Sequence, residues 1–278
     1  MYPDPLISIA GSGIFWLYDL FLLIGVFCAI ILCDIMGAKR GFSARLQLVV
    51  LVSTVLCVVV GYWFATLFQA FYNFRANPDA GFHLDENTGA TFYGGLIGGA
   101  ATFLACYFFL GKRYVKNGEA IKKIPDMLSI AACCIPLGHG FGRLGCLMAG
   151  CCHGKPTDAW YGIYMKELGV KVVPVQLFES IVLFLIAAVF LYLFFTGRDK
   201  KLPLFGVYCM VYGVWRFFIE FARGDDRGAT IVSVFSPSQL IAVVLVTFGI
   251  GYLVAWAIYR KKKKEQVDSG TENLSDQA

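Results

Sequence analysis

Long runs of apolar residues alternate with short polar segments along almost the whole chain. Seven runs are long enough for an α-helix to cross a hydrocarbon core of about 30 Å, and they cover residues 13–36, 47–71, 92–111, 127–150, 174–196, 203–222 and 235–258. Helices satisfy their own backbone hydrogen bonds, as a bilayer requires. The pattern predicts an all-α integral membrane protein, with one seven-helix domain over residues 1–264 and a polar, disordered tail over residues 265–278.

The composition agrees with a membrane location. Hydrophobic residues make up 58% of the 278 residues and charged residues only 15%, so the chain is more apolar than an average soluble domain. The segment before the first run has no basic residues, and we expect no cleaved signal peptide. The ten cysteines do not show the spacing of a small disulfide scaffold.

The basic residues indicate how the helices are oriented. Most of the 24 lysines and arginines lie in alternate connections and directly after the last run, where Arg260 is followed by four lysines. Cytoplasmic loops carry the excess of Lys and Arg, so we expect the N-terminus outside and the C-terminus in the cytoplasm. Because topology accounts for these cations, the net charge of +5 does not indicate a nucleic-acid partner.

Polar chemistry is concentrated at the end of the fourth run. His139, Arg143 and Cys146 recur there at helical spacing. Gly142 and Gly145, between them, permit close approach of another helix or of a ligand. A charged side chain at bilayer depth is unfavourable and usually marks function. The alternative is that the glycines serve helix packing and that the guanidinium reaches the outer headgroups.

Two further runs carry charged residues among their apolar ones. Gln176 and Glu179 share one face at the start of the fifth run. The sixth run has a polar stripe at helical spacing, formed by Tyr212, Arg216, Glu220 and Arg223. An ion pair within that one helix would be a purely structural explanation. However, two arginines deep in separate helices are more positive charge than one carboxylate would neutralise. Guanidinium groups also bind phosphate. We therefore expect a site for the headgroup of an anionic phospholipid.

Several motifs follow one another in order along the runs. They are Tyr18 and Gly25, Phe71-Tyr72-Asn73, Gly94-Gly95-Leu96-Ile97-Gly98, Gly142-Arg143-Leu144-Gly145 with Gly150 and Gly154, Pro174-Val175-Gln176-Leu177-Phe178-Glu179, and Tyr212-Gly213 with Arg216, Glu220 and Arg223. Their order and spacing resemble those of the bacterial prolipoprotein diacylglyceryl transferase family. The resemblance implies transfer of diacylglycerol from phosphatidylglycerol to the lipobox cysteine of a prolipoprotein at the bacterial plasma membrane. No metal or organic cofactor is required for such a displacement.

The resemblance also implies roles for individual residues. Arg143 and Arg216 would hold the phosphate as glycerol phosphate leaves, in a pocket that stabilises the developing charge. Glu220 would orient Arg216. The residues expected to bind substrate are Tyr18, Gly142, Arg143, Gly145, Cys146, Gly154, Gln176, Glu179, Glu220 and Arg223.

Three positions depart from the family pattern. The family usually has histidine where Tyr93 stands, asparagine where Cys146 stands and an acidic residue where Cys151 stands. Tyrosine, with an ordinary pKa of about 10, is a poor general base at neutral pH. A histidine elsewhere could replace it, and we expect the catalytic residues to be Arg143, Arg216, Tyr93, His139 and His153.

Two alternatives remain open. Cys146, Cys151, Cys152 and His153 form a C-x4-C-C-H pattern that could ligate zinc or react covalently with lipid. Structural zinc sites use separated cysteine pairs, and adjacent cysteines seldom both reach one ion comfortably, so we expect no metal. The second alternative is a catalytically diverged phospholipid-binding or lipid-transporting protein of the same fold, since carriers also use broken, glycine-rich helices.

Overall fold

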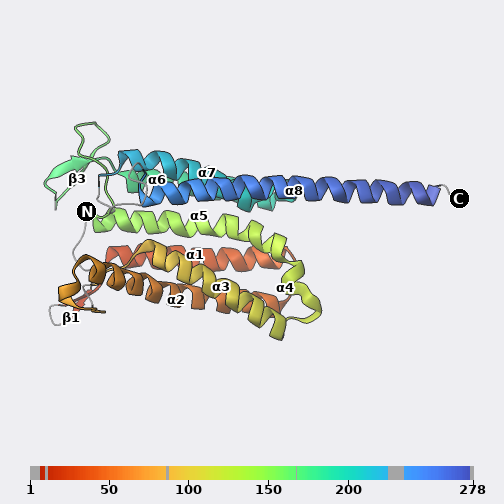
Figure 1. Ribbon diagram of the computed structural model, residues 1–278, viewed down its shortest axis with the longest axis horizontal. Coiled ribbons are helices and arrows are strands. Elements are labelled where there is room, and N and C mark those ends of the chain that lie inside the picture. Colours follow the sequence, from red (N-terminus) through yellow and green to blue (C-terminus); the bar gives the residue numbers. More distant parts are fainter. Residues whose placement is uncertain (1–6, 10–11, 86–87, 167, 225–234, 276–278) are drawn as a thin grey trace. The chain divides into compact units, whose positions relative to one another are not determined.

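The computed structural model describes residues 7–9, 12–85, 88–166, 168–224 and 235–275. Seven of the described helices are long and apolar enough to cross a membrane, which confirms the predicted number of spans (Figure 1). These helices are α1 (Leu17–Lys39), α2 (Ala44–Ala76), α3 (Phe92–Tyr114), α5 (Ile124–Ala149), α6 (Val175–Phe195), α7 (Leu204–Ile219) and α8 (Pro237–Ser275).

Two helices extend well beyond their predicted limits. Helix α2 starts three residues before the predicted run because Ser43 caps it, its side-chain Oγ accepting a hydrogen bond from the Leu46 backbone N–H at 3.2 Å. These first residues are partly polar, so hydropathy does not detect them. Helix α8 continues to Ser275. The predicted disorder of residues 265–278 stays a prediction.

Short elements join the membrane-spanning helices. Strands β1 (Ile7–Ile9) and β2 (Ser12–Phe15) form an antiparallel hairpin before α1. A second hairpin, between α5 and α6, pairs β3 (Ile163–Met165) with β4 (Val170–Val172), and the short helix α4 (Glu119–Lys122) precedes α5. Strands of this length are too short to show an alternating pattern in the sequence.

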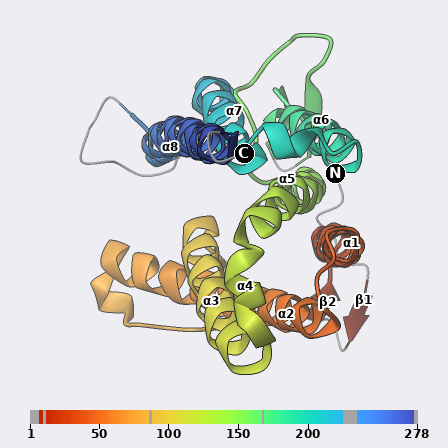
Figure 2. The same ribbon diagram turned by 90° about the vertical axis from the view of Figure 1, so that its right-hand side faces the viewer.

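The chain divides into two compact units. One unit comprises residues 1–29 and 128–278, so it holds the start of α1, most of α5, and all of α6, α7 and α8. Residues 30–127 form the other unit, with the end of α1 and with α2, α3 and α4. Figure 2 shows helices α5 to α8 of the first unit close to end-on.

Glycines bring α2 and α3 together in the unit of residues 30–127. A Cβ added to Gly61 would lie 3.1 Å from the backbone oxygen of Gly95 and 3.3 Å from the Cα of Gly99. A Cβ at Gly94 would lie 2.7 Å from the backbone oxygen of Phe64. Only hydrogen side chains fit at this distance. The glycine repeat at the start of the third span therefore serves helix packing.

Close packing also holds the helices of the other unit. A Cβ added to Gly213 of α7 would lie 2.9 Å from the backbone oxygen of Ala242 in α8. Helix α6 contacts α5 through Ser180, whose hydroxyl donates to the backbone oxygen of Gly140 at 3.0 Å. Large apolar side chains such as Phe218 remain exposed, as expected of surfaces that face lipid. Most of the buried charged residues form ion pairs with one another instead.

Candidate functional site

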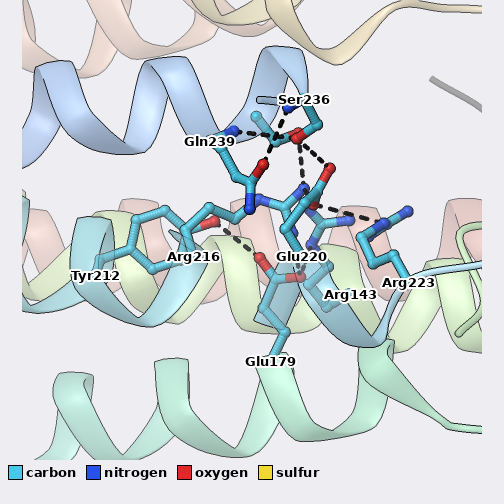
Figure 3. A network of polar contacts seen from close by, with 9 residues as sticks. Arg143, Glu179, Tyr212, Arg216, Glu220, Arg223, Ser236 and Gln239 are labelled. Atoms are coloured by element: carbon cyan, nitrogen blue, oxygen red, sulfur yellow. Dashed lines mark hydrogen bonds and ion pairs between the residues drawn. The ribbon is translucent and has the colours of Figure 1, made fainter. Parts of the chain in front are cut away.

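Three helices of one unit each direct one charged side chain to the same point (Figure 3). Nε of Arg143, in α5, lies 3.1 Å from Oε2 of Glu179, in α6. Nη1 of Arg216, in α7, lies 3.7 Å from the same carboxylate oxygen. The two arginines that the sequence singles out are therefore brought together, and Glu179 is the group between them.

Glu179 is held in this position by a second contact. Its other oxygen, Oε1, accepts a hydrogen bond of 2.8 Å from the hydroxyl of Tyr212. The residue is fully buried. Pro174 stands directly before the first turn of α6, where its fixed φ suits a helix start, and Glu179 lies in the second turn. Such a carboxylate orients both guanidinium groups rather than meeting solvent.

A second carboxylate extends the cluster along the end of α7. Oε2 of Glu220 lies 2.7 Å from Nη2 of Arg216 and 3.8 Å from Nε of Arg223. The helix ends at Ile219 and a 3-10 turn covers Glu220–Ala222, so the stripe predicted from helical spacing continues past the helix end. The predicted pairing of Arg216 with Glu220 exists, but it accounts for only one of the contacts of Arg216.

The start of α8 supplies polar residues that sequence reasoning missed. The hydroxyl of Ser236 donates to Oε1 of Glu220 at 2.8 Å, and Nη2 of Arg216 donates to the hydroxyl of Ser238 at 2.9 Å. Oε1 of Gln239 accepts from the backbone N–H of Ser236 at 3.0 Å. The serines and the glutamine at the start of the last apolar run could have indicated a polar site there. Serine at such a position, however, commonly serves as a helix cap.

The cluster is buried and carries a surplus of positive charge. The side chains of Arg143, Glu179, Arg216, Glu220 and Arg223 are each 9% exposed or less. Among the described residues, three guanidinium groups and two carboxylates leave a net charge of +1. Charge in a poorly solvated interior is unfavourable unless it is compensated. An anionic ligand group would provide that compensation.

A tightly packed loop joins α5 to this cluster. The backbone N–H of Gly154 donates to the oxygen of Val173 at 3.0 Å, and Gly154 also pairs with Arg223 in an isolated β-bridge. A Cβ at Gly154 would lie 2.8 Å from the backbone oxygen of Ala222. The buried Gln176 anchors the loop by donating from Nε2 to the backbone oxygen of Cys151. The loop thus fixes the segment that carries Arg223.

Two of the predicted glycines differ in their surroundings. A Cβ at Gly145 would lie 3.0 Å from the ring of Tyr18. This glycine therefore lets α1 approach α5, and Tyr18 packs against α5 about one turn before that helix ends. A Cβ at Gly142 meets nothing within 4 Å in the described part of the chain. Of the close approach by a helix or a ligand that the sequence suggested for both, Gly145 shows the approach of a helix, whereas Gly142 has open space beside it.

The candidate bases lie in three different settings. His139, one turn before Arg143 on α5, contacts the ring of Tyr212 edge to face, with centroids 5.3 Å apart. Nδ1 of His153 lies 3.0 Å from the backbone oxygen of Gly154 in the loop. Tyr93, beside Phe92 at the start of α3, belongs to the other unit. His139 is thus the histidine that contacts a residue of the charged cluster.

Seven apolar spans, together with a buried cluster of arginines and carboxylates within one of the two units, define a multi-pass membrane protein with a cationic internal site. The chain belongs to the prolipoprotein diacylglyceryl transferase family, whose family model matches residues 5–255. This confirms the resemblance drawn from the motifs.

Relatives from several bacteria are similar over most of their length. A protein of Clostridium tetani named phosphatidylglycerol–prolipoprotein diacylglyceryl transferase is 32% identical, over 84% of this chain and 90% of its own. A protein of Clostridium perfringens with the same name, numbered 2, is 30% identical over 84% of this chain and 88% of its own. A protein of Marinomonas sp. with the same name, without a number, is 31% identical over 91% of this chain and 94% of its own.

Proposed function

We propose that this protein transfers the diacylglyceryl group of phosphatidylglycerol to the cysteine thiol of a prolipoprotein. The family and the names of the relatives support the reaction class. The observation that carries the proposal for the site is the meeting of Arg143 and Arg216 at one oxygen of Glu179, within membrane-spanning helices. A phosphate group is the anion that a phospholipid would bring to such a site.

The arginines act on the leaving group. The thiol sulfur forms a bond to the glyceryl carbon, the bond from that carbon to the phosphate oxygen breaks, and glycerol phosphate departs with the electron pair. A guanidinium group has five N–H donors, so each arginine can hold a protein carboxylate and a phosphate together. Fixed donors in a poorly hydrated pocket stabilise the charge that develops on the leaving oxygen.

The carboxylates position the arginines. Glu179 is in contact with two of them and Glu220 with Arg216 and Arg223, so the donors are oriented before substrate binds. The net charge of +1 then favours a phosphodiester, which carries one negative charge. The other proposed binding residues lie around the end of α5 and the start of α6. They are Tyr18, Gly142, Gly145, Cys146, Gly154 and Gln176.

The acceptor thiol must lose its proton, because thiolate is the effective nucleophile. We assign this step to His139 or His153, with Tyr93 standing where the family usually has histidine. If the variants His139→Ala and His153→Ala, made singly and together, transfer lipid at the wild-type rate, the assignment is wrong. The contact of His139 with Tyr212 makes it the first of the two to test.

The partners and location follow from the reaction. The donor is phosphatidylglycerol and the acceptor is a prolipoprotein signal peptide with a lipobox cysteine, both reached from within the plasma membrane of a bacterium. The site faces the outer side, with the N-terminus outside and the C-terminus in the cytoplasm. No cofactor takes part.

A transfer assay tests the function directly. Purified protein in detergent micelles is given phosphatidylglycerol labelled in its acyl chains and a synthetic lipobox peptide. We expect labelled peptide and free glycerol phosphate in equal amounts. Saturable lipid binding without product would instead identify a phospholipid-binding protein that has lost catalysis. The same peptide with serine in place of cysteine is the control, because its hydroxyl is a much weaker nucleophile.

A further inference from the structure

Three cysteine side chains gather at the end of α5. The Sγ atoms of Cys146, Cys151 and Cys152 all lie within 4.8 Å of one another. Cys146 belongs to the last turns of the helix, and the other two follow Gly150, whose φ of +73° turns the chain back at the helix end. The group thus combines a rigid helix with a short loop.

The backbone explains how adjacent cysteines reach one point. Neighbouring side chains of an extended chain point to opposite sides, which argues from sequence against a shared ion. Cys152, however, has a φ of +62°, in the left-handed region that residues with a Cβ rarely adopt. This conformation lets Cys151 and Cys152 both face Cys146. The two adjacent thiols of this loop therefore both lie close to the thiol of Cys146.

Several hydrogen bonds hold the loop in this strained conformation. The backbone N–H of Cys151 donates to the oxygen of Cys146 at 3.2 Å, and the buried Gln176 donates to the backbone oxygen of Cys151. Beyond the cysteines, the backbone N–H of Gly224 donates to the oxygen of His153 at 3.2 Å. Unusual backbone conformations persist where the surroundings determine them, and they are concentrated at functional sites.

The sulfur positions suit a metal ion. A Zn–S bond is about 2.3 Å, which places tetrahedral ligands about 3.8 Å apart. Sulfurs within 4.8 Å of one another reach that spacing by moving about 1 Å or less, whereas a disulfide requires about 2 Å between them.

We propose that Cys146, Cys151 and Cys152 form a three-thiolate site for a soft divalent cation of the zinc group, with the fourth coordination position open. Binding releases the three thiol protons to solvent and involves no oxidation. Softness of the ligands selects such ions over Mg²⁺ or Ca²⁺, which prefer oxygen. Nothing in the proposed transfer reaction requires this ion, so the site is an addition to it.

Occupancy of the site would affect the charged cluster. Three thiolates and a divalent ion carry a net charge of −1, and Cys146 lies one turn from Arg143, whose cluster carries +1. The bound ion and its ligands therefore compete electrostatically with an anionic headgroup. We expect the cation to inhibit transfer, and this consequence rests on the proposed function.

Titration with Cd²⁺ tests the site without any activity measurement. The full chain, reduced and kept without oxygen in detergent micelles, is titrated while the sulfur-to-cadmium charge-transfer absorption is recorded. We expect one ion per chain, with Cd²⁺ displacing bound Zn²⁺, and an affinity about 10-fold weaker or more in each of the variants Cys146→Ser, Cys151→Ser and Cys152→Ser. Cys134→Ser is the matched control, because Cys133 and Cys134 are also adjacent but lie within helix α5.

Three results would overturn the site. One is wild-type affinity in two or more of the single serine variants, and another is the same loss of affinity in Cys134→Ser. The third is a mass two hydrogens lower than that of the free-thiol protein, with a disulfide among the three cysteines and no bound ion, which would identify a redox pair. Inhibition is measured separately, as the ratio of transfer rates with and without Cd²⁺ for each protein. A ratio near one with the site occupied would refute the competition and leave the site established.

Discussion

The replacement Glu179→Gln tests the central arrangement of the charged cluster. It keeps the shape of the side chain and removes the anion that lies 3.1 Å from Arg143 and 3.7 Å from Arg216. At an effective dielectric constant of about 20, these two attractions amount to about 5 and about 4 kcal/mol before desolvation is subtracted. Removing one partner of a buried pair typically costs about 3–5 kcal/mol. We expect a loss of stability in that range, because the net charge of the cluster rises from +1 to +2.

Titration with sodium dodecyl sulfate in mixed micelles measures the free energy of unfolding of wild type and variant. A ligand that binds the folded state stabilises it by mass action, so added phosphatidylglycerol should recover part of the loss. The control is Glu265→Gln, whose carboxylate lies 4.0 Å from Lys261 in an exposed pair that contributes little. A variant at position 179 as stable as the control would refute the claim that Glu179 holds the arginines.

Three further replacements probe the site and the loop. Arg216→Lys keeps the charge and loses the planar set of donors, so we expect transfer to slow by about 10²–10³-fold, with Arg75→Lys, at an exposed position, unchanged in the same assay. Tyr212→Phe removes a hydrogen bond to a buried carboxylate and should lower the free energy of unfolding by about 1.5–3 kcal/mol; a loss below about 0.5 kcal/mol would contradict the geometry. Gly154→Ala places a methyl group against two backbone oxygens and should destabilise the protein by about 1–3 kcal/mol, whereas Gly142→Ala, with open space around it, should be as stable as wild type in the same unfolding titration.

The seven spans could be predicted because span formation is a local property. A run of about 20 apolar residues is sufficient for a helix to cross lipid, whatever the rest of the chain does. The polar stripe of α7 was equally accessible, since Arg216 and Glu220 are one helical turn apart. The family could be identified because the order of its motifs is itself a property of the sequence.

Contacts between helices depended on the tertiary structure. Arg143, Glu179 and Arg216 lie on three different helices, and the sequence supplied all three without indicating that one carboxylate oxygen serves both arginines. Ser236 could not be assigned to the cluster, because a serine before a helix is usually a cap. The same limit applied to Gly142 and Gly145, which are alike in sequence and differ in what packs against them.

The sequence by itself thus determined the membrane class, the number of spans, the family and the identity of most charged residues at the site. The tertiary structure decided which of those charges meet, that Glu179 lies between the arginines, and that three thiols converge at the end of α5. Hydropathy and helical spacing act within one segment, where residue order is enough. Convergence depends instead on how helices pack and on single backbone torsions, such as the left-handed φ of Cys152.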